Sequence, residues 1–113
     1  MSAAFTHLTA DLSGVRDEQL RDLPLITGLL IAAVGGAGLS SLAPPALHER
    51  PRGGMTAVLL LEPGHLIVHA LPDRGRLILD MLTLSTQEPL KALEVFTRRL
   101  APRDVRTEMR AIG

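Results

Sequence analysis

The chain has 113 residues, of which 46% are hydrophobic and 21% charged, and this predicts one small globular domain over residues 1–113. Its 12 basic and 12 acidic residues give a formal net charge of zero, so neither nucleic acid nor a membrane surface is expected as a partner. Cysteine is absent, which excludes disulfides, thiolate metal sites and thiol catalysis and fits a cytoplasmic protein.

The first part of the chain predicts a strand followed by a long helix. Polar and apolar residues alternate over residues 5–12, as in a strand with one buried face. Residues 17–21 predict one helical turn, and Asp22 is a suitable N-cap for a longer helix that tolerates Pro24 in its first turn. The two glycines at 35–36 are expected to end this helix. Its apolar face carries Leu25, Ile26, Leu29, Leu30, Ala33 and Val34.

The apolar run continues to residue 42. We read it as a buried helix plus a strand rather than a membrane span, because Pro24 and several glycines interrupt it. Residues 39–47 contain the pair Pro44-Pro45, so any strand there is an edge strand or is broken. The segment Arg50-Pro51-Arg52-Gly53-Gly54 is predicted to form a loop.

The middle of the chain predicts a β-meander of three strands, over residues 56–61, 66–71 and 76–82. The first two are separated by Glu62-Pro63-Gly64-His65, in which Pro and Gly take the second and third places of a type II turn. Pro72-Asp73-Arg74-Gly75 forms the second turn. Strands joined by such short turns run antiparallel. His65 and His69 are four residues apart, so on the central strand they share one face.

The last part of the chain predicts a second helix and a final strand. Ser85 and Glu88 match a capping box, in which the serine caps a helix and the glutamate follows three residues later. Apolar residues at helical spacing extend to about Leu100, and Pro102 ends the helix. Residues 105–109 predict a strand. The order is then β-α-β-β-β-β-α-β, which predicts an α+β two-layer sandwich with two helices on one face of a mostly antiparallel sheet.

Two segments of the meander resemble a known family. Residues 65–73, HLIVHALPD, resemble the pattern Glu-Ser-His-Leu-Ser-Ile-His-Thr-Trp-Pro-Glu, and residues 75–83, GRLILDMLT, resemble Gly-Tyr-Ala-Ala-Ile-Asp-Leu-Phe-Thr-Cys. Both patterns belong to the prokaryotic S-adenosylmethionine decarboxylases of polyamine (spermidine) biosynthesis. Weaker matches, such as His7-Leu8 to Gly-x-His-Leu and residues 88–92 to Asp-Pro-Trp-Lys-Ala, extend the resemblance over nearly the whole chain. The resemblance implies the family's sandwich fold and a homodimer.

The resemblance also implies a chemistry for which this sequence lacks the residues. In the family, a serine hydroxyl attacks the preceding peptide carbonyl, β-elimination breaks the chain, and the serine becomes an N-terminal pyruvoyl group that acts as electron sink during decarboxylation. The matching position here is Gly64, and residues 57–82 contain no Ser, Thr or Cys. The family's acid cysteine falls at Leu84, and its two stacking aromatics fall at Arg50 and Leu71.

Three positions keep a similar residue. His69 matches the family's processing histidine, Thr56 replaces a serine, and Asp73 replaces a substrate-contacting glutamate. We therefore predict an uncleaved chain without a pyruvoyl cofactor, in which Thr56 and His69 are vestigial catalytic residues and Gly64 marks the lost serine. The predicted ligand-binding positions are Glu62, His65, Leu71, Asp73 and Arg50.

These losses favour a pseudo-enzyme that binds a partner, such as an active decarboxylase paralogue, or a small metabolite of the polyamine pathway. One alternative is an active decarboxylase-type lyase. Another is an anion site or a metal site, although we expect no metal because the family's histidines bind none. Glu62 with His65 as an acid/base pair lacks a nucleophile. The candidate zinc ligands are His65 and His69 with His48 or His7, and the candidate anion ligands are Arg50, Arg52, Arg74 and Arg76.

Overall fold

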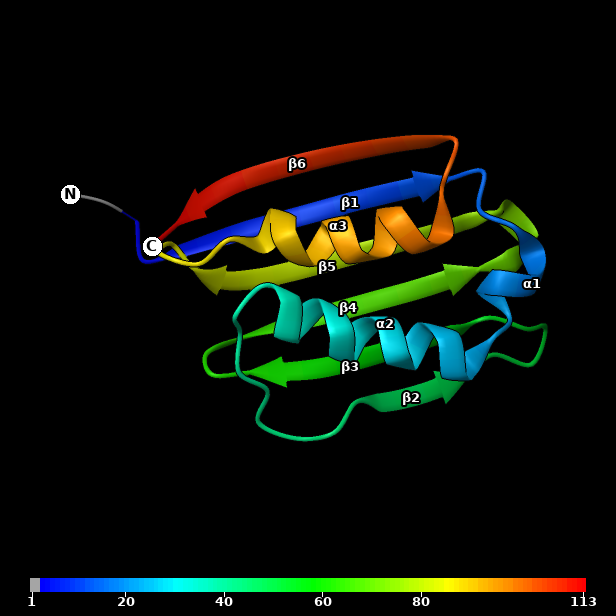
Figure 1. Cartoon of the computed structure of the whole chain (residues 1–113), viewed down its shortest axis with the longest axis horizontal. Helices are drawn as coiled ribbons and strands as arrows, with labels where there is room; N and C mark the ends of the chain where they lie inside the picture. The colour runs from blue at the N-terminus through cyan, green and yellow to red at the C-terminus, as the bar shows by residue number, and fades with distance from the viewer. Residues whose placement is uncertain (1–2) are drawn as a thin grey trace.

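The structure, a computed structural model, describes residues 3–113, which form a six-stranded antiparallel sheet of order β2-β3-β4-β5-β1-β6 (Figure 1). The strands are β1 (Phe5–Ser13), β2 (Ala46–Glu49), β3 (Met55–Leu61), β4 (Gly64–Leu71), β5 (Arg76–Leu84) and β6 (Asp104–Ile112). The helices are α1 (Asp17–Leu20), α2 (Leu23–Gly36) and α3 (Pro89–Leu100), with a 3-10 turn, η1, at Pro72–Arg74. The predicted order of elements and the α+β two-layer class are confirmed.

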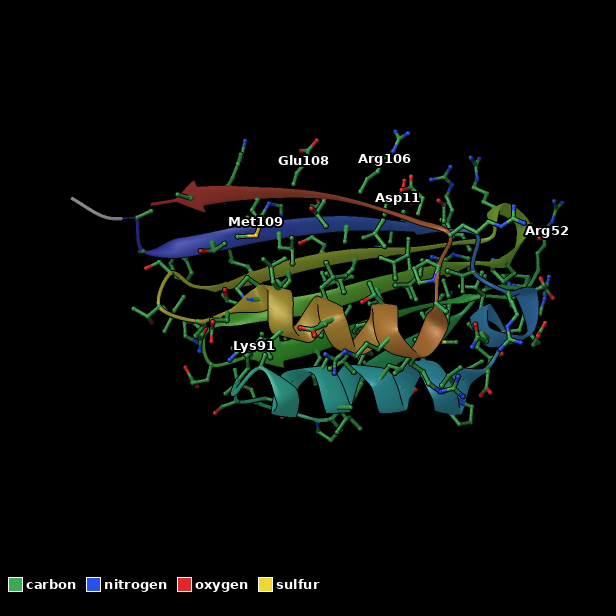
Figure 2. All side chains as sticks on the ribbon, turned by 45° about the horizontal axis from the view of Figure 1, so that its top comes forward. Asp11, Arg52, Lys91, Arg106, Glu108 and Met109 are labelled. Atoms are coloured by element: carbon green, nitrogen blue, oxygen red, sulfur yellow. The ribbon has the colours of Figure 1, made fainter. Side chains whose placement is uncertain are left out.

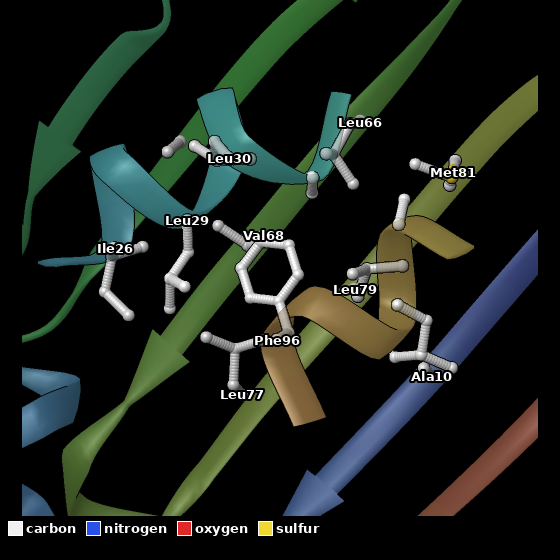
Figure 3. Packing of buried hydrophobic residues seen from close by; sticks show 14 of the residues in the cluster. Ala10, Ile26, Leu29, Leu30, Leu66, Val68, Leu77, Leu79, Met81 and Phe96 are labelled. Atoms are coloured by element: carbon white, nitrogen blue, oxygen red, sulfur yellow. The ribbon is translucent and has the colours of Figure 1, made fainter. Parts of the chain in front are cut away.

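The core lies between the sheet and helices α2 and α3, which run side by side over one face of the sheet (Figure 1). Every second residue of β1, β3, β4 and β5 points toward the helices and is buried, as the two-residue period of a strand requires. Phe96 of α3 is fully buried and lies at the centre of this layer near Leu29, Val68 and Leu77 (Figure 3). The buried residues form one continuous apolar cluster.

The ends of α2 follow from local chemistry, as predicted. The Asp22 carboxylate accepts a hydrogen bond from the backbone N–H of Leu25 (3.0 Å), so it satisfies one of the free donors of the first turn. The helix ends at Gly36. Five of the six residues of the predicted apolar face are buried, and Leu25, at the start, is half-buried.

The start of α3 differs from the prediction, because Ser85 does not cap it. Strand β5 continues to Leu84, and the backbone N–H of Ser85 then donates to the carbonyl of Ala4. The helix begins at Pro89, and Glu88 before it has a non-helical backbone (φ −118°, ψ 83°) and makes no side-chain cap. Proline disfavours the helical conformation in the residue before it and fits the first helical position, so Pro89 decides where the helix begins.

The first turn of the meander also differs from the prediction. Leu61 pairs with Gly64, so the hairpin loop consists of Glu62 and Pro63, and β4 begins at Gly64. The peptide bond between Glu62 and Pro63 is cis. A type II turn over residues 62–65 is therefore wrong, since the strand pairing extends beyond the point that the sequence indicated.

The remaining sequence predictions concern the edges of the sheet and the membrane. Strand β2 follows the Pro44-Pro45 pair and is an edge strand, whereas the segment before the prolines contributes only an isolated bridge between Ser41 and Leu61. The final strand is found at β6, longer than predicted. Within residues 3–113, no helix is long and apolar enough to cross a membrane.

The packing of the core predicts that two apolar residues of α3 contribute very differently to the free energy of unfolding. Replacing the fully buried Phe96 by alanine leaves a cavity and should lower the free energy of unfolding by about 3–5 kcal/mol. Leu90 of the same helix is 50% exposed, so Leu90→Ala should cost less than about 1 kcal/mol. Urea unfolding of both variants checks this, and equal losses would contradict the packing.

Candidate functional site

The polar strand residues Thr56, His65 and His69 lie on the face of the sheet opposite α2 and α3, which we call the open face. Thr56 pairs with His69 across β3 and β4, and both alternate with buried neighbours. His65 and His7 each lie opposite Leu82 of β5, on either side of it. Figure 2 shows Arg106 and Glu108 of β6 also pointing away from the helices. In the described part of the chain, no helix covers the open face.

One polar cluster joins Arg50, Thr56 and His69. The Oγ1 atom of Thr56 lies 2.9 Å from Nδ1 of His69. The guanidinium of Arg50 donates to Thr56 Oγ1 and to the carbonyl of Ala70 (3.1 Å), and it lies 3.3 Å from His69 Nδ1. A guanidinium only donates, so the threonine oxygen accepts from Arg50, and its own proton points to Nδ1. The neutral ring of His69 then carries its proton on Nε2.

The electrostatics of this cluster agree with a neutral imidazole. Burial lowers the pKa of His69 below its usual 6.5, and the positive charge of Arg50 lowers it further. The charge of Asp80 acts in the opposite direction but does not outweigh them. The pair Thr56–His69 can thus hold a proton between a hydroxyl and a neutral imidazole, with Arg50 holding both in place.

A second polar cluster was not predicted as such and centres on Asp80 of β5. One carboxylate oxygen, Oδ1, lies 2.9 Å from Nε2 of His7 and 3.0 Å from Nε2 of His65. Burial acts to raise the pKa of Asp80, but the hydrogen bonds and charges of the two histidines outweigh it, so the pKa is lowered. The only indication of this cluster in the sequence was the single carboxylate, Asp80, in the apolar run GRLILDMLT. Because the partners come from three strands, the sequence did not show that they meet.

Gly64 lies where the resemblance places the serine of the family, and its surroundings leave no room for a side chain. Its φ is +114°, a conformation that favours glycine. A β-carbon at this position would lie 2.0 Å from the carbonyl oxygen of Leu82. Leu84, at the position of the family's cysteine, is the last residue of β5 and is half-buried.

A hollow of about 370 Å³ lies at the end of the sheet where β4 ends and the loop before β3 begins. Three of the predicted ligand positions, Arg50, Leu71 and Asp73, line it. The other two do not, because Glu62 lies in the β3–β4 turn and His65 lies at the start of β4, which is the opposite end of that strand. The hollow is lined by Arg50, Pro51, Arg52, Gly53, Leu71, Pro72, Asp73 and Arg74.

The geometry gives the metal alternative no support. Within residues 3–113, no group of three or more His, Asp or Glu side chains is arranged to hold a metal ion. His65 and His69 share a face as predicted, but they turn to different partners, Asp80 and Thr56. His48 lies on the edge strand β2 and is exposed.

Known proteins with similar sequences identify the family of this chain. The family model described as S-adenosylmethionine decarboxylase matches residues 6–111. The chain belongs to the S-adenosylmethionine decarboxylase family. It is 34% identical over 100 residues to the S-adenosylmethionine decarboxylase proenzyme of Sulfurihydrogenibium sp. (strain YO3AOP1), covering 88% of this chain and 74% of that protein. The identity and both coverages are the same for the proenzyme of Persephonella marina.

A solved structure of the family agrees with the fold. The crystal structure of the adenosylmethionine decarboxylase from Aquifex aeolicus VF5 superposes with a TM-score of 0.91, covering 100% of this chain and 93% of the other at 24% identity. This superposition confirms the S-adenosylmethionine decarboxylase-like sandwich. The family assignment links the chain to the polyamine pathway, as the resemblance implied.

The Arg50–His69 contact predicts a pH effect. Below pH 6.5 the unfolded chain takes up a proton at His69 that the folded chain resists, so this site lowers the free energy of unfolding as pH falls. Arg50→Gln removes the second cause of the lowered pKa, so the pKa of His69 should rise while staying below 6.5 because burial remains. The loss of stability below pH 6.5 should also become smaller.

NMR titration of the His69 ring and urea unfolding at a series of pH values measure both effects. Arg52→Gln is the matched control, since Arg52 makes no side-chain contact with His69 among the described residues. An unchanged titration of His69 in Arg50→Gln would contradict the assigned contact.

Proposed function

We propose that this protein is a non-processing member of the S-adenosylmethionine decarboxylase family, which keeps its chain intact and works by binding a ligand or a partner. The observation that carries the proposal is Gly64. It has neither the hydroxyl that would attack the peptide bond nor the β-carbon from which elimination would follow. Its backbone also packs against the carbonyl of Leu82, where a β-carbon would lie only 2.0 Å away.

A hydroxyl elsewhere in the chain does not take over the missing step, because the reaction needs the hydroxyl on the residue that follows the cleaved peptide bond, and that residue is Gly64. Thr56 is the nearest hydroxyl before Gly64 in the sequence, but it pairs with His69, five residues along β3 from the end of the strand at Leu61. At about 3.3 Å per residue this places it roughly 16 Å from the turn. Its hydroxyl is also held by Arg50 and His69. Leu84 offers no proton to a substrate.

The intact scaffold beside these losses supports a binding role in polyamine biosynthesis. The relatives are named proenzymes of S-adenosylmethionine decarboxylase, and a chain with their fold but without their nucleophile can bind a pathway metabolite or pair with an active paralogue. The alternative is an active decarboxylase, and it requires a pyruvoyl group that Gly64 cannot supply. A cytoplasmic location stays a prediction.

We propose in addition that two copies of the chain, or this chain and a paralogue, associate through the open face. This face carries half-buried apolar residues, among them Val58, Ile67, Ile78 and Leu82, and Leu60 is 51% exposed. A second sheet packed on them would bury these residues, as in other two-sheet arrangements.

The intact chain is the first prediction of this proposal. A denaturing mass spectrum of the purified protein should show one species at 12.1 kDa, because no pyruvoyl precursor is available. The Sulfurihydrogenibium relative, expressed and purified in the same way, is the control for cleavage. Two fragments divided near residues 62–65 would overturn the proposal and favour the active enzyme.

The second prediction concerns the attempt to restore the serine. Gly64→Ser should leave the chain uncleaved. It should also lower the free energy of unfolding by about 1–3 kcal/mol more than a serine placed at a glycine with free space around it, because the turn must move away from Leu82. Gly38→Ser is the matched control, since Gly38 has φ +68° but no atom within 4 Å of its added β-carbon. Mass spectrometry and urea unfolding read out both variants. Efficient cleavage of Gly64→Ser would show that only the hydroxyl was missing.

A further inference from the structure

The hollow described above has an arginine built into its inner wall. Arg50 follows the last residue of β2, and its guanidinium reaches over β3 and β4 to bind Thr56, His69 and the carbonyl of Ala70. These contacts fix one positive charge at the point where the family resemblance places an aromatic ring. The side chain is half-buried, so solvent screens its charge less than that of a free surface arginine.

Two further arginines complete a positive rim. Arg52 and Arg74 line the hollow, and their side chains make no hydrogen bond or ion pair with any of residues 3–113. Figure 2 places Arg52 at the end of the sheet beside α1. Arg76, the fourth arginine that the sequence suggested, lies on β5 and is bound to Asp11 at 2.6 Å, so it is not part of the rim.

Negative charge at the hollow is scarce. Asp73 is the only carboxylate among its lining residues, and it also pairs with Arg21 at 3.9 Å. Arg21 itself is held by Asp17 at 2.8 Å. Three arginines therefore face one shared carboxylate, in a chain whose net charge is zero. Such a concentration attracts an anion and repels a cationic amine or sulfonium.

The remaining walls suit a small organic molecule. Pro51, Leu71 and Pro72 give the hollow an apolar side, and its volume of about 370 Å³ is at the lower end of the range of small-molecule sites. Guanidinium groups bind carboxylate and phosphate oxygens through two parallel hydrogen bonds. A fixed Arg50 and two free arginines at the rim can thus enclose one such group.

We propose that the hollow binds a small molecule through a phosphate or carboxylate group, with Arg50 as the fixed donor and Arg52 and Arg74 as donors that close on the anion. This inference rests on the proposed binding function and names its class of ligand. Because Arg50 also binds Thr56 and His69, an anion that contacts Arg50 changes the environment of the His69 ring. The resemblance places an aromatic ring at position 50, and the arginine found there favours an anionic ligand.

The experiment measures binding of pyrophosphate, citrate and spermidine to the full chain at low salt, by calorimetry. Pyrophosphate or citrate should bind, and which of the two binds more tightly distinguishes phosphate from carboxylate. Spermidine should not bind. The double variant Arg52→Gln/Arg74→Gln should lose at least tenfold in affinity for the anion. Arg50→Phe, which puts back a ring, should lose a similar factor.

The matched control is the double variant Arg98→Gln/Arg106→Gln, which removes the same charge from exposed positions outside the hollow. It should bind the anion as the unchanged chain does. Equal losses in both double variants, no anion binding, or spermidine binding would each overturn the inference. Thermal unfolding confirms that every variant is folded, and shifts of the His69 ring signals on adding anion locate the site.

The outcome separates this inference from the function on which it rests. An intact chain that fails the anion test removes the ligand class but leaves the non-processing proposal standing. A chain that is cleaved near residues 62–65 removes the proposed function whatever the anion result.

Discussion

The structure depends on the one-sided covering of an antiparallel sheet. Because side chains alternate along each strand, placing α2 and α3 on one face divides every inner strand into a sealed set and an open set of residues. The residues on the covered face, the sealed set, are apolar where they are buried, apart from Thr83 in β5, and they pack against the helices. The open set carries Thr56, His65, His69 and Asp80. The chemistry of the site and the stability of the fold therefore rest on different residues.

This division explains how the family's chemistry can be lost while its fold is kept. The positions that differ, Arg50, Gly64, Leu71 and Leu84, lie in turns, at strand ends or on the open face, and none belongs to the buried core. Core residues of the same strands, such as Leu66 in β4 and Met81 in β5, are fully buried. Differences at these positions therefore leave the buried core unchanged, and this agrees with a superposition of TM-score 0.91 at 24% identity.

The sequence predicted structural features well when the residues that determine them are close together in the chain, and poorly when those residues are far apart. Asp22 caps α2 as predicted because the capping oxygen and the N–H that it binds are three residues apart. The capping box predicted at Ser85 is wrong, because Pro89 and the longer strand β5 determine where α3 begins. The loop between β3 and β4 differs from the predicted turn over residues 62–65, because its position depends on the pairing of the two whole strands. The bond between His7 and Asp80 joins residues 73 apart, and no local pattern indicates it.

The contact between Gly64 and the Leu82 carbonyl has a consequence for engineering of the chain. Strand β5 leaves no space for a β-carbon at position 64, so any side chain introduced there has to displace the turn between β3 and β4. An engineered functional group at this position therefore requires a compensating change in the turn or in β5, and not the replacement of Gly64 alone.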